Sequence, residues 1–345
     1  MKKSDELKKD EVFPKTDEEE PAKETYRESQ KRIPLTATPK FWMGTSFLLL
    51  GFILFNQLFT ITISPKRFIA NKGVVGNTSV TPTGTATGKA DLSALALKVI
   101  PKGGVELPVT FGDLGKQMIA AGVIDENKFR QLFTGNGEKI TDEEEKLLVG
   151  NLTSKIKLNS ENSRFLLDYL WALGLGNKSS VLEKGPMMEK PSDIGNFAST
   201  GGWTAANGKA VEHYSKHTFI TLNTTQAALV EEAAKGIFRP CCGNSTYFPD
   251  CNHGMAMLGL LELMAAQGVS KDQMYKTALA VNAFWFPQTY VELAAYFSER
   301  GVDWDKVNPV EVLGANFSSG RGYQNIRTQI KSLPEPPKGG GGCGA

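Results

Sequence analysis

The first long apolar run of the chain covers residues 41–63, FWMGTSFLLLGFILFNQLFTITI, and contains no charged side chain in 23 positions. A helix rises by about 1.5 Å per residue, so a run of this length crosses a hydrocarbon core of about 30 Å. Trp42 lies at one end, where an amphipathic ring favours the headgroup level. The run begins only at residue 41 and is longer than the apolar part of a signal peptide, so we expect a retained transmembrane helix.

Beyond residue 90 the apolar positions recur at the spacing of α-helices. The clearest examples are 161–174, 224–235 and 271–299, the last of which is interrupted at Pro287. Strand patterns are scarce, and the best of them, 218–222, is short. These patterns predict a mostly α fold for the part of the chain that follows the membrane span.

Capping boxes predict where several of these helices begin. In this motif a cap side chain and a residue three positions later satisfy each other's backbone amides. Four pairs fit the motif fully or loosely: Thr110 with Asp113, Thr141 with Glu144, Asn223 with Gln226, and Ser270 with Gln273. We therefore expect a helix to begin after each of these cap residues.

One predicted helix, residues 252–267, is apolar on nearly every side. Such a helix is buried all round, and this one is too short to span a membrane. Glu262 is its only carboxylate, and a buried carboxylate must be paired, bound to a metal or protonated. Gly259 would let a neighbouring helix approach closely.

The segments on either side of the membrane span differ in composition. Residues 1–40 hold ten basic and ten acidic side chains, so we expect a disordered charged tail without a core of its own. More basic residues precede the span than follow it, which favours a cytoplasmic N-terminus. Residues 64–90 are read as a flexible linker, because 76–88 consists almost wholly of Gly, Ser, Thr, Pro and Asn.

The sequence thus predicts a single-pass signal-anchor protein of the cell membrane, whose helical domain at 91–333 lies outside the cytoplasm. The stretch 176–210, rich in Gly, Pro, Ser and Asn, is expected to form a long loop between two halves at 91–180 and 211–333. Residues 334–345 are read as a flexible Pro/Gly tail. The cytoplasmic tail either binds a protein partner or is a plain solvated segment.

Overall charge excludes one broad class of function. Lys and Arg total 39 and Asp and Glu total 37, so the net charge is +2. A nucleic-acid-binding protein would carry a basic excess, and we expect no nucleic-acid partner. Four cysteines in 345 residues are too few for a disulfide scaffold, although they are enough for a site.

The residues best suited to bind a soft metal are confined to the last part of the chain. No histidine or cysteine precedes residue 213, and the full set is His213, His217, Cys241, Cys242, Cys251, His253 and Cys343. The pattern Cys-Cys-x8-Cys-x-His leads into the predicted buried helix. Asp250 is a candidate N-cap for that helix, whose dipole would favour a thiolate at Cys251.

Thiolate and imidazole groups together suit a soft or borderline metal, which is zinc, copper or an iron–sulfur unit. The leading prediction is a protein for metal handling or redox chemistry, with its site at Cys241, Cys242, Cys251 and His253. His213 and His217 would join the site if their segment is helical, because residues four apart share a helix face.

Other interpretations of the same residues stay open. An oxidising compartment favours disulfides, for example between Cys242 and Cys251, and the chain would then be an interaction or scaffold domain with a structural staple. A structural zinc site would serve the same purpose. A thiol oxidoreductase would use Cys241 or Cys242 to attack and Cys251 to resolve. Inert packing of the cysteines, and an incidental Cys343, are the remaining alternatives.

Overall fold

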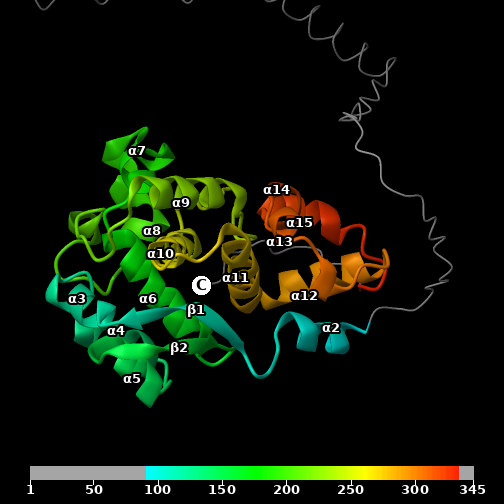
Figure 1. Ribbon diagram of the computed structural model, residues 1–345, viewed down its shortest axis with the longest axis horizontal. Helices are drawn as coiled ribbons and strands as arrows, with labels where there is room; N and C mark the ends of the chain where they lie inside the picture. The colour runs from blue at the N-terminus through cyan, green and yellow to red at the C-terminus, as the bar shows by residue number, and fades with distance from the viewer. Residues whose placement is uncertain (1–90, 334–345) are drawn as a thin grey trace, which may run out of the picture. The chain divides into compact units, whose positions relative to one another are not determined.

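The computed structural model describes residues 91–333, which form the mostly helical unit shown in Figure 1. The prediction of a mostly α fold is confirmed for this part of the chain. The predicted charged tail, transmembrane helix and linker, and the Pro/Gly tail at 334–345, lie outside the described residues. Within 91–333, no helix has both the length and the apolar character that a membrane crossing requires.

The unit consists of helices of very different lengths and one pair of strands. The helices of the first part are α2 (Leu92–Val99), α3 (Leu114–Ala120), α4 (Glu126–Thr134), α5 (Asp142–Val149) and α6 (Ser163–Gly176), and the strands are β1 (Val105–Gly112) and β2 (Leu152–Leu158). Short helices follow: α7 (Ser180–Lys184), η1 (Pro186–Met188), η2 (Pro191–Asn196), α8 (Ala198–Gly201) and η3 (Ala210–His213). The last part holds α9 (Thr224–Gly236), α10 (Asn252–Ala266), α11 (Lys271–Trp285), α12 (Pro287–Ser298), η4 (Trp304–Lys306), α13 (Pro309–Val312), α14 (Ala315–Ser318) and α15 (Gly320–Arg327).

Helix α10 is the centre of the unit and packs against α6, α8, α9 and α11 (Figure 1). Every residue from Gly254 to Ala265 is buried, so the prediction of one fully buried helix is confirmed. The crossing with α6 depends on two glycines. A Cβ atom added to Gly259 would lie 2.8 Å from the backbone nitrogen of Gly174, so the two helix backbones are in contact.

The strand pair was not predicted in this place. β1 and β2 are antiparallel, with Val105 opposite Leu158, and alternate residues of β1 are buried against the helices. The capping box proposed at Thr110 is therefore wrong, because Thr110 lies inside β1 and its amide donates to the side chain of Gln267. The proposed strand at 218–222 is also wrong, since this segment has no strand structure.

The other predicted helix starts are confirmed. Thr141 with Glu144 and Asn223 with Gln226 form complete capping boxes at α5 and α9. The Ser270 hydroxyl accepts a hydrogen bond from the backbone amide of Gln273 at the start of α11. The predicted interruption at Pro287 separates α11 from α12, because proline has no amide hydrogen for a continuous helix.

The stretch 176–210 is more ordered than its composition predicts. It contains four short helices in place of one long loop. Apolar side chains hold it to the core: the indole of Trp203 is buried, donates a hydrogen bond of 2.8 Å to the Val123 carbonyl, and packs against Trp171. Gly and Pro residues thus mark turns between short helices here, and the stretch is part of the core.

Segments far apart in the sequence meet at the C-terminal end of the unit. α2 lies along α12, as Figure 1 shows. α15 is held to α12 by the buried carboxylate of Glu292, which accepts hydrogen bonds from the Tyr323 hydroxyl and from Arg327. The start of α15 also contacts the loop between α9 and α10, because the Gly320 amide donates a hydrogen bond of 2.7 Å to the Cys242 carbonyl. This loop carries the candidate site.

Candidate metal centre

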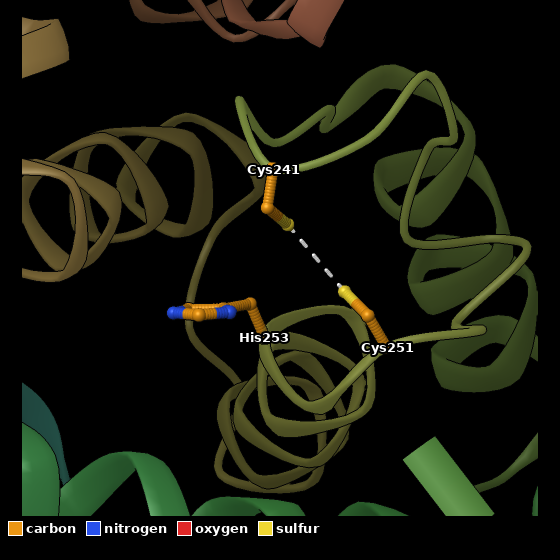
Figure 2. Close-up of side chains that lie close together, drawn as sticks. All are labelled: Cys241, Cys251 and His253. Carbon is orange, nitrogen blue, oxygen red and sulfur yellow. Dashed lines mark hydrogen bonds between the residues drawn. The ribbon is translucent and has the colours of Figure 1, made fainter. Parts of the chain in front are cut away.

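The loop between α9 and α10 and the start of α10 bring together four of the six predicted ligands, Cys241, Cys242, Cys251 and His253, in two overlapping groups that share Cys251. The sulfur atoms of Cys241 and Cys251 lie 3.6 Å apart, and one thiol donates to the other. One ligand atom from each of Cys241, Cys251 and His253 lies within 4.8 Å of the other two. Figure 2 shows the two cysteine side chains pointing toward each other, with the His253 ring beside them at the start of α10. All three residues are half-buried.

The chain between the cysteines is fixed by backbone contacts near its start. The Thr246 amide and hydroxyl both donate to the Ile237 carbonyl, over 2.8 and 3.1 Å. The Phe238 carbonyl accepts a hydrogen bond from the Asn282 side chain of α11. These contacts close the loop over a short span, so residues ten positions apart in sequence face each other.

Arg239 is the largest buried polar side chain in this region and was not singled out from the sequence. Its exposed fraction is only 2%, and its Nε atom donates to the Cys251 sulfur over 2.9 Å. The two Nη atoms donate to the carbonyls of Asn244 and Phe248, over 3.1 and 3.0 Å. An ion pair with Asp250 completes its contacts. A fixed guanidinium therefore joins the loop to the thiol at the start of α10.

Asp250 does not cap α10, contrary to the prediction. The N-cap is Cys251, and neither side chain bonds to the first amides of the helix. One Asp250 oxygen accepts from Arg239, and the other accepts a hydrogen bond of 2.9 Å from the side-chain amide of Asn244. Although Asp250, Cys242 and Cys251 also lie within 4.8 Å of one another, both carboxylate oxygens are already engaged. Asp250 is therefore better placed to support the site than to bind an ion.

The position of Cys251 favours its thiolate form. The thiols of Cys241 and Cys242 hydrogen bond to Cys251 and lower its pKa, and the Arg239 charge acts in the same direction. The complementary contacts to Cys242 and Cys251, together with burial, raise the pKa of Cys241. The start of a helix also stabilises a thiolate. The expectation that Cys251 is the main anionic sulfur agrees with this geometry.

The third candidate ligand, His253, has a buried nitrogen with no hydrogen-bond partner. Its Nδ1 atom is unpaired within residues 91–333, although such buried polar atoms are nearly always satisfied. The ring packs against Phe286, at 4.4 Å between centroids, and against the edge of Trp285 at 5.7 Å. Aromatic walls thus hold the imidazole in place beside Cys251, with its Nδ1 atom available to a ligand.

His213 and His217 lie in a different contact from the cysteines. Their segment is a short 3-10 helix followed by a turn in which Ser215 has a φ of 49°, so the helical condition for sharing a face is not met. Instead Nδ1 of His213 and Nε2 of His217 are 3.0 Å apart, and the other His213 nitrogen bonds to the Asn207 carbonyl over 2.8 Å. Burial and the neighbouring His213 lower the pKa of His217. Neither histidine belongs to the two groups of candidate ligands found among the described residues.

Glu262 does not support the cysteine site either. It lies two to three turns further along α10 and is completely buried. The Asn177 side-chain amide donates to one carboxylate oxygen over 2.8 Å, and hydrogen bonds from Ser179 and Asn177 both lower the pKa of Glu262. Burial raises the pKa of Glu262 to about 8, so a neutral carboxylic acid is favoured at neutral pH. This answers how a lone carboxylate is accommodated on the buried helix.

Two features of the sequence could have identified Arg239 and Gly254 as parts of the site. Arg239 directly precedes Pro-Cys-Cys and is an isolated charge in an otherwise uncharged stretch. Gly254 directly follows His253, and a Cβ atom there would lie 2.5 Å from the Arg239 Cζ atom. The glycine therefore makes room for the guanidinium against the first turn of α10.

The arrangement is chemically suited to bind a metal ion. Bonds of about 2.0–2.3 Å from zinc to nitrogen and sulfur place the ligand atoms of one ion within about 4 Å of one another. The Cys241 and Cys251 sulfurs already satisfy this requirement, and His253 needs only a small movement. No disulfide joins the cysteines described at 241, 242 and 251. A Cys/His cluster that can hold a metal is thus present, without an assigned element.

Comparisons with known proteins add no family to this description. No model of a protein family matches the sequence, and neither the curated proteins nor the solved structures contain a match. The argument for function therefore depends on the chemistry of the site itself.

Proposed function

We propose that this chain is a membrane-anchored extracytoplasmic protein that binds one soft or borderline metal ion at Cys241, Cys251 and His253, for metal handling or redox chemistry. Cys242 lies next to these ligands and could replace one of them as a ligand of the same ion. The ion supplies Lewis acidity or a redox couple when bound, and the chain supplies a preformed pair of sulfurs and one imidazole.

The observation that carries the proposal is that three candidate ligand atoms, two sulfurs and one imidazole nitrogen, lie within 4.8 Å of one another. Two sulfurs are 3.6 Å apart, and the nearby imidazole has a buried Nδ1 atom without a partner among the described residues. Inert packing does not explain an unsatisfied buried nitrogen, because leaving such an atom unpaired costs about 1–3 kcal/mol. A bound cation would satisfy the nitrogen and neutralise the thiolates.

The direct test is elemental analysis of the full-length chain, purified in mild detergent without added metal, combined with a count of reactive thiols. We expect one metal ion per chain, and thiols at 241, 242 and 251 that become reactive after chelation. The element found identifies the cofactor. A chain without metal that also fails to take up zinc, copper or iron in solution would refute the proposal.

Two cysteine variants separate the site from a general loss of thiols. Cys251→Ser is expected to abolish stoichiometric metal binding, because it removes the sulfur shared by both groups of candidate ligands. Cys343→Ser is the matched control, since it removes one thiol and leaves the three proposed ligands intact. Equal metal content in both variants would contradict the assignment of the ligands.

The location in the membrane is a separate part of the proposal, supported by the uncharged run at 41–63 and by the basic residues before it. Alkaline carbonate extraction tests the anchor, because an integral span stays in the membrane pellet. An impermeant thiol reagent tests the orientation, since it should label cysteines of the domain in intact cells after chelation. Release of the chain by carbonate would show that the run does not span the bilayer.

A second candidate function follows from the same sulfur distance. Cys241 and Cys251 point toward each other, so oxidation would join them in a disulfide that staples an interaction domain. The measurement above distinguishes the two functions: a staple gives no metal and two fewer thiols than the metal site. Reduction would then destabilise the domain, whereas chelation would have no effect.

A further inference from the structure

The residue that most distinguishes this centre from a simple cluster of cysteines is Arg239. Its guanidinium is almost completely buried and lies in direct contact with one ligand, at 2.9 Å from the Cys251 sulfur. A metal–sulfur bond is about 2.3 Å long, so an ion bound by Cys251 lies only a few ångström from a permanent positive charge. The protein thus places a cation beside the position of another cation.

The nearby negative charge only partly offsets Arg239. Asp250 pairs with the guanidinium on the side of its Nη2 atom, while Nε faces the Cys251 sulfur. The Asp250 side chain is 23% exposed, against 2% for Arg239, so water screens the carboxylate more strongly than the guanidinium. Asp250 weakens the positive field at the centre but does not cancel it.

The helix adds to the positive side of this balance. Cys251 is the N-cap residue of α10, a helix of 15 residues, and the first amides of a helix carry a partial positive charge of roughly half a unit. The Cys251 side chain does not cap these amides; the Asn252 side-chain oxygen accepts a hydrogen bond of 2.9 Å from the His253 amide, and the other first amides contribute a positive field near the sulfur. Arg239 and the helix start therefore both oppose a high charge on a bound ion.

Coulomb repulsion by these fixed charges is twice as strong for a divalent ion as for a monovalent ion at the same position. Two thiolates, Arg239 and Asp250 together carry a net charge of −2, which attracts either ion, and Arg239 reduces this attraction twice as much for a divalent ion as for a monovalent ion. Resting on the metal-binding function proposed above, we infer that Arg239 is a specificity-determining residue that biases the centre toward a monovalent soft ion of the copper(I) class over a divalent ion of the zinc(II) class.

The test is the ratio of two affinities, measured on the full-length chain and its variants. Cu(I) is titrated against a chromophoric copper(I) chelator under anaerobic reducing conditions, and Zn(II) against a chromophoric zinc chelator. Arg239→Gln removes the charge and keeps amide donors, and we expect the preference for Cu(I) over Zn(II) to fall about tenfold or more. Asp250→Asn removes the opposing charge, and we expect the same preference to rise.

The two variants are expected to change the preference for Cu(I) over Zn(II) in opposite directions. General damage to the loop would not produce this pair of changes. A purely structural role of Arg239 would weaken both ions in parallel and leave the ratio unchanged, which would overturn the inference. If Arg239→Gln does not fold, Asp250→Asn decides alone, and an unchanged or lower preference for Cu(I) overturns it. Asp193→Asn is the matched control, because it breaks an exposed ion pair with Lys190 and should not change the ratio.

Failure of the inference differs from failure of the proposed function. If the parent chain binds neither Cu(I) nor Zn(II), the metal centre itself is wrong. If both ions bind and the ratio is the same in all variants, the centre stands and the role of Arg239 in selecting the ion is refuted.

Discussion

The side-chain amide of Asn177 donates a hydrogen bond of 2.8 Å to Glu262, and neither residue has any exposed surface. Asn177 lies at the C-cap of α6 and also accepts hydrogen bonds from the amides of Phe219 and Ile220. One asparagine thus connects the end of α6, the segment after η3 and the buried helix α10. The second Glu262 oxygen has no partner among the described residues, which fits a protonated acid more than a carboxylate.

Glu262 should make the stability of the domain depend on pH. Its pKa rises from 4.5 to about 8 on folding, so the folded state holds a proton that the unfolded state releases. The stabilising contribution is complete below pH 4.5, declines by up to about 1.4 kcal/mol per pH unit above it, and is lost as the pH rises through about 8. Urea unfolding between pH 5 and about 8 measures this slope.

Glu262→Gln is the variant that isolates this effect. The neutral amide can accept the Asn177 hydrogen bond but cannot ionise, so we expect a flatter dependence of stability on pH and a more stable domain than the parent at pH 8. Glu231→Gln is the control, because this residue forms an exposed pair with Lys235 on α9. A variant that keeps the slope of the parent would show that Glu262 is not its source.

Gly259→Ala should destabilise the domain strongly. The added Cβ atom would lie 2.7 Å from the Leu170 carbonyl oxygen and 2.8 Å from the Gly174 nitrogen, and backbone atoms cannot rotate away. We expect a loss of about 1–3 kcal/mol or more in the free energy of unfolding. Gly103→Ala, where a Cβ atom meets nothing within 4 Å, should leave the urea midpoint nearly unchanged. Similar midpoints for the two variants would argue against a close crossing of α6 and α10.

Gly254→Ala should change the preference of the centre between metal ions without altering any ligand. Its Cβ atom would lie 2.5 Å from the Arg239 Cζ atom, so the guanidinium must move and give up its contact with Cys251. We expect the preference for Cu(I) over Zn(II) to fall, as in Arg239→Gln, because the positive charge moves away from the Cys251 sulfur. Gly243→Ala tests the same loop without a clash, because nothing lies within 4 Å of its Cβ position. Competition titrations with chromophoric chelators measure the affinities for both ions. Equal values for the two variants would show that Gly254 does not position Arg239 for metal binding.

His213 and His217 remain predicted ligands from the sequence, and the structure leads to a clear expectation for them. Because their ring nitrogens bond to each other over 3.0 Å, we expect His213→Asn and His217→Asn to retain one metal ion per chain. His253→Asn should lose it, since this imidazole lies with the cysteines. Elemental analysis of the three purified variants checks this, and metal loss in the first two would restore the larger ligand set.

Trp285 provides a spectroscopic signal for the centre. Its ring lies 5.7 Å from that of His253, so binding of an ion at the imidazole should change tryptophan emission. We expect the change to disappear in Trp285→Phe and to persist in Trp304→Phe, which removes a tryptophan that packs against Tyr290. A response that persists in Trp285→Phe would place the bound ion elsewhere.

Much of the helical framework followed from local signals. The cap at Thr141 and the break at Pro287 were predicted because caps and proline act within a few residues. The burial of α10 followed from its lack of a polar face. β1 was missed because its partner β2 is about 40 residues further along, and no short-range pattern records such a pairing.

The candidate site was predicted only in part, because only some of its contacts join residues that are close in the sequence. Cys251 and His253 are two positions apart at a helix start, so their proximity is local. The contact between Cys241 and Cys251 depends on how the loop closes, and the contact of Arg239 depends on a glycine fifteen positions later. His213 and His217 were grouped with the cysteines on residue type alone, and residue type does not record where a chain turns.

The fit of Arg239 against Gly254 also has an evolutionary consequence. Since any larger residue at 254 would occupy the space of the guanidinium, a lineage that replaced the glycine would be free to lose the arginine, and one that keeps the arginine must keep the glycine. The two positions should therefore be inherited as one unit in related chains, so a search for relatives should require both, Arg two positions before the first cysteine and Gly directly after the histidine.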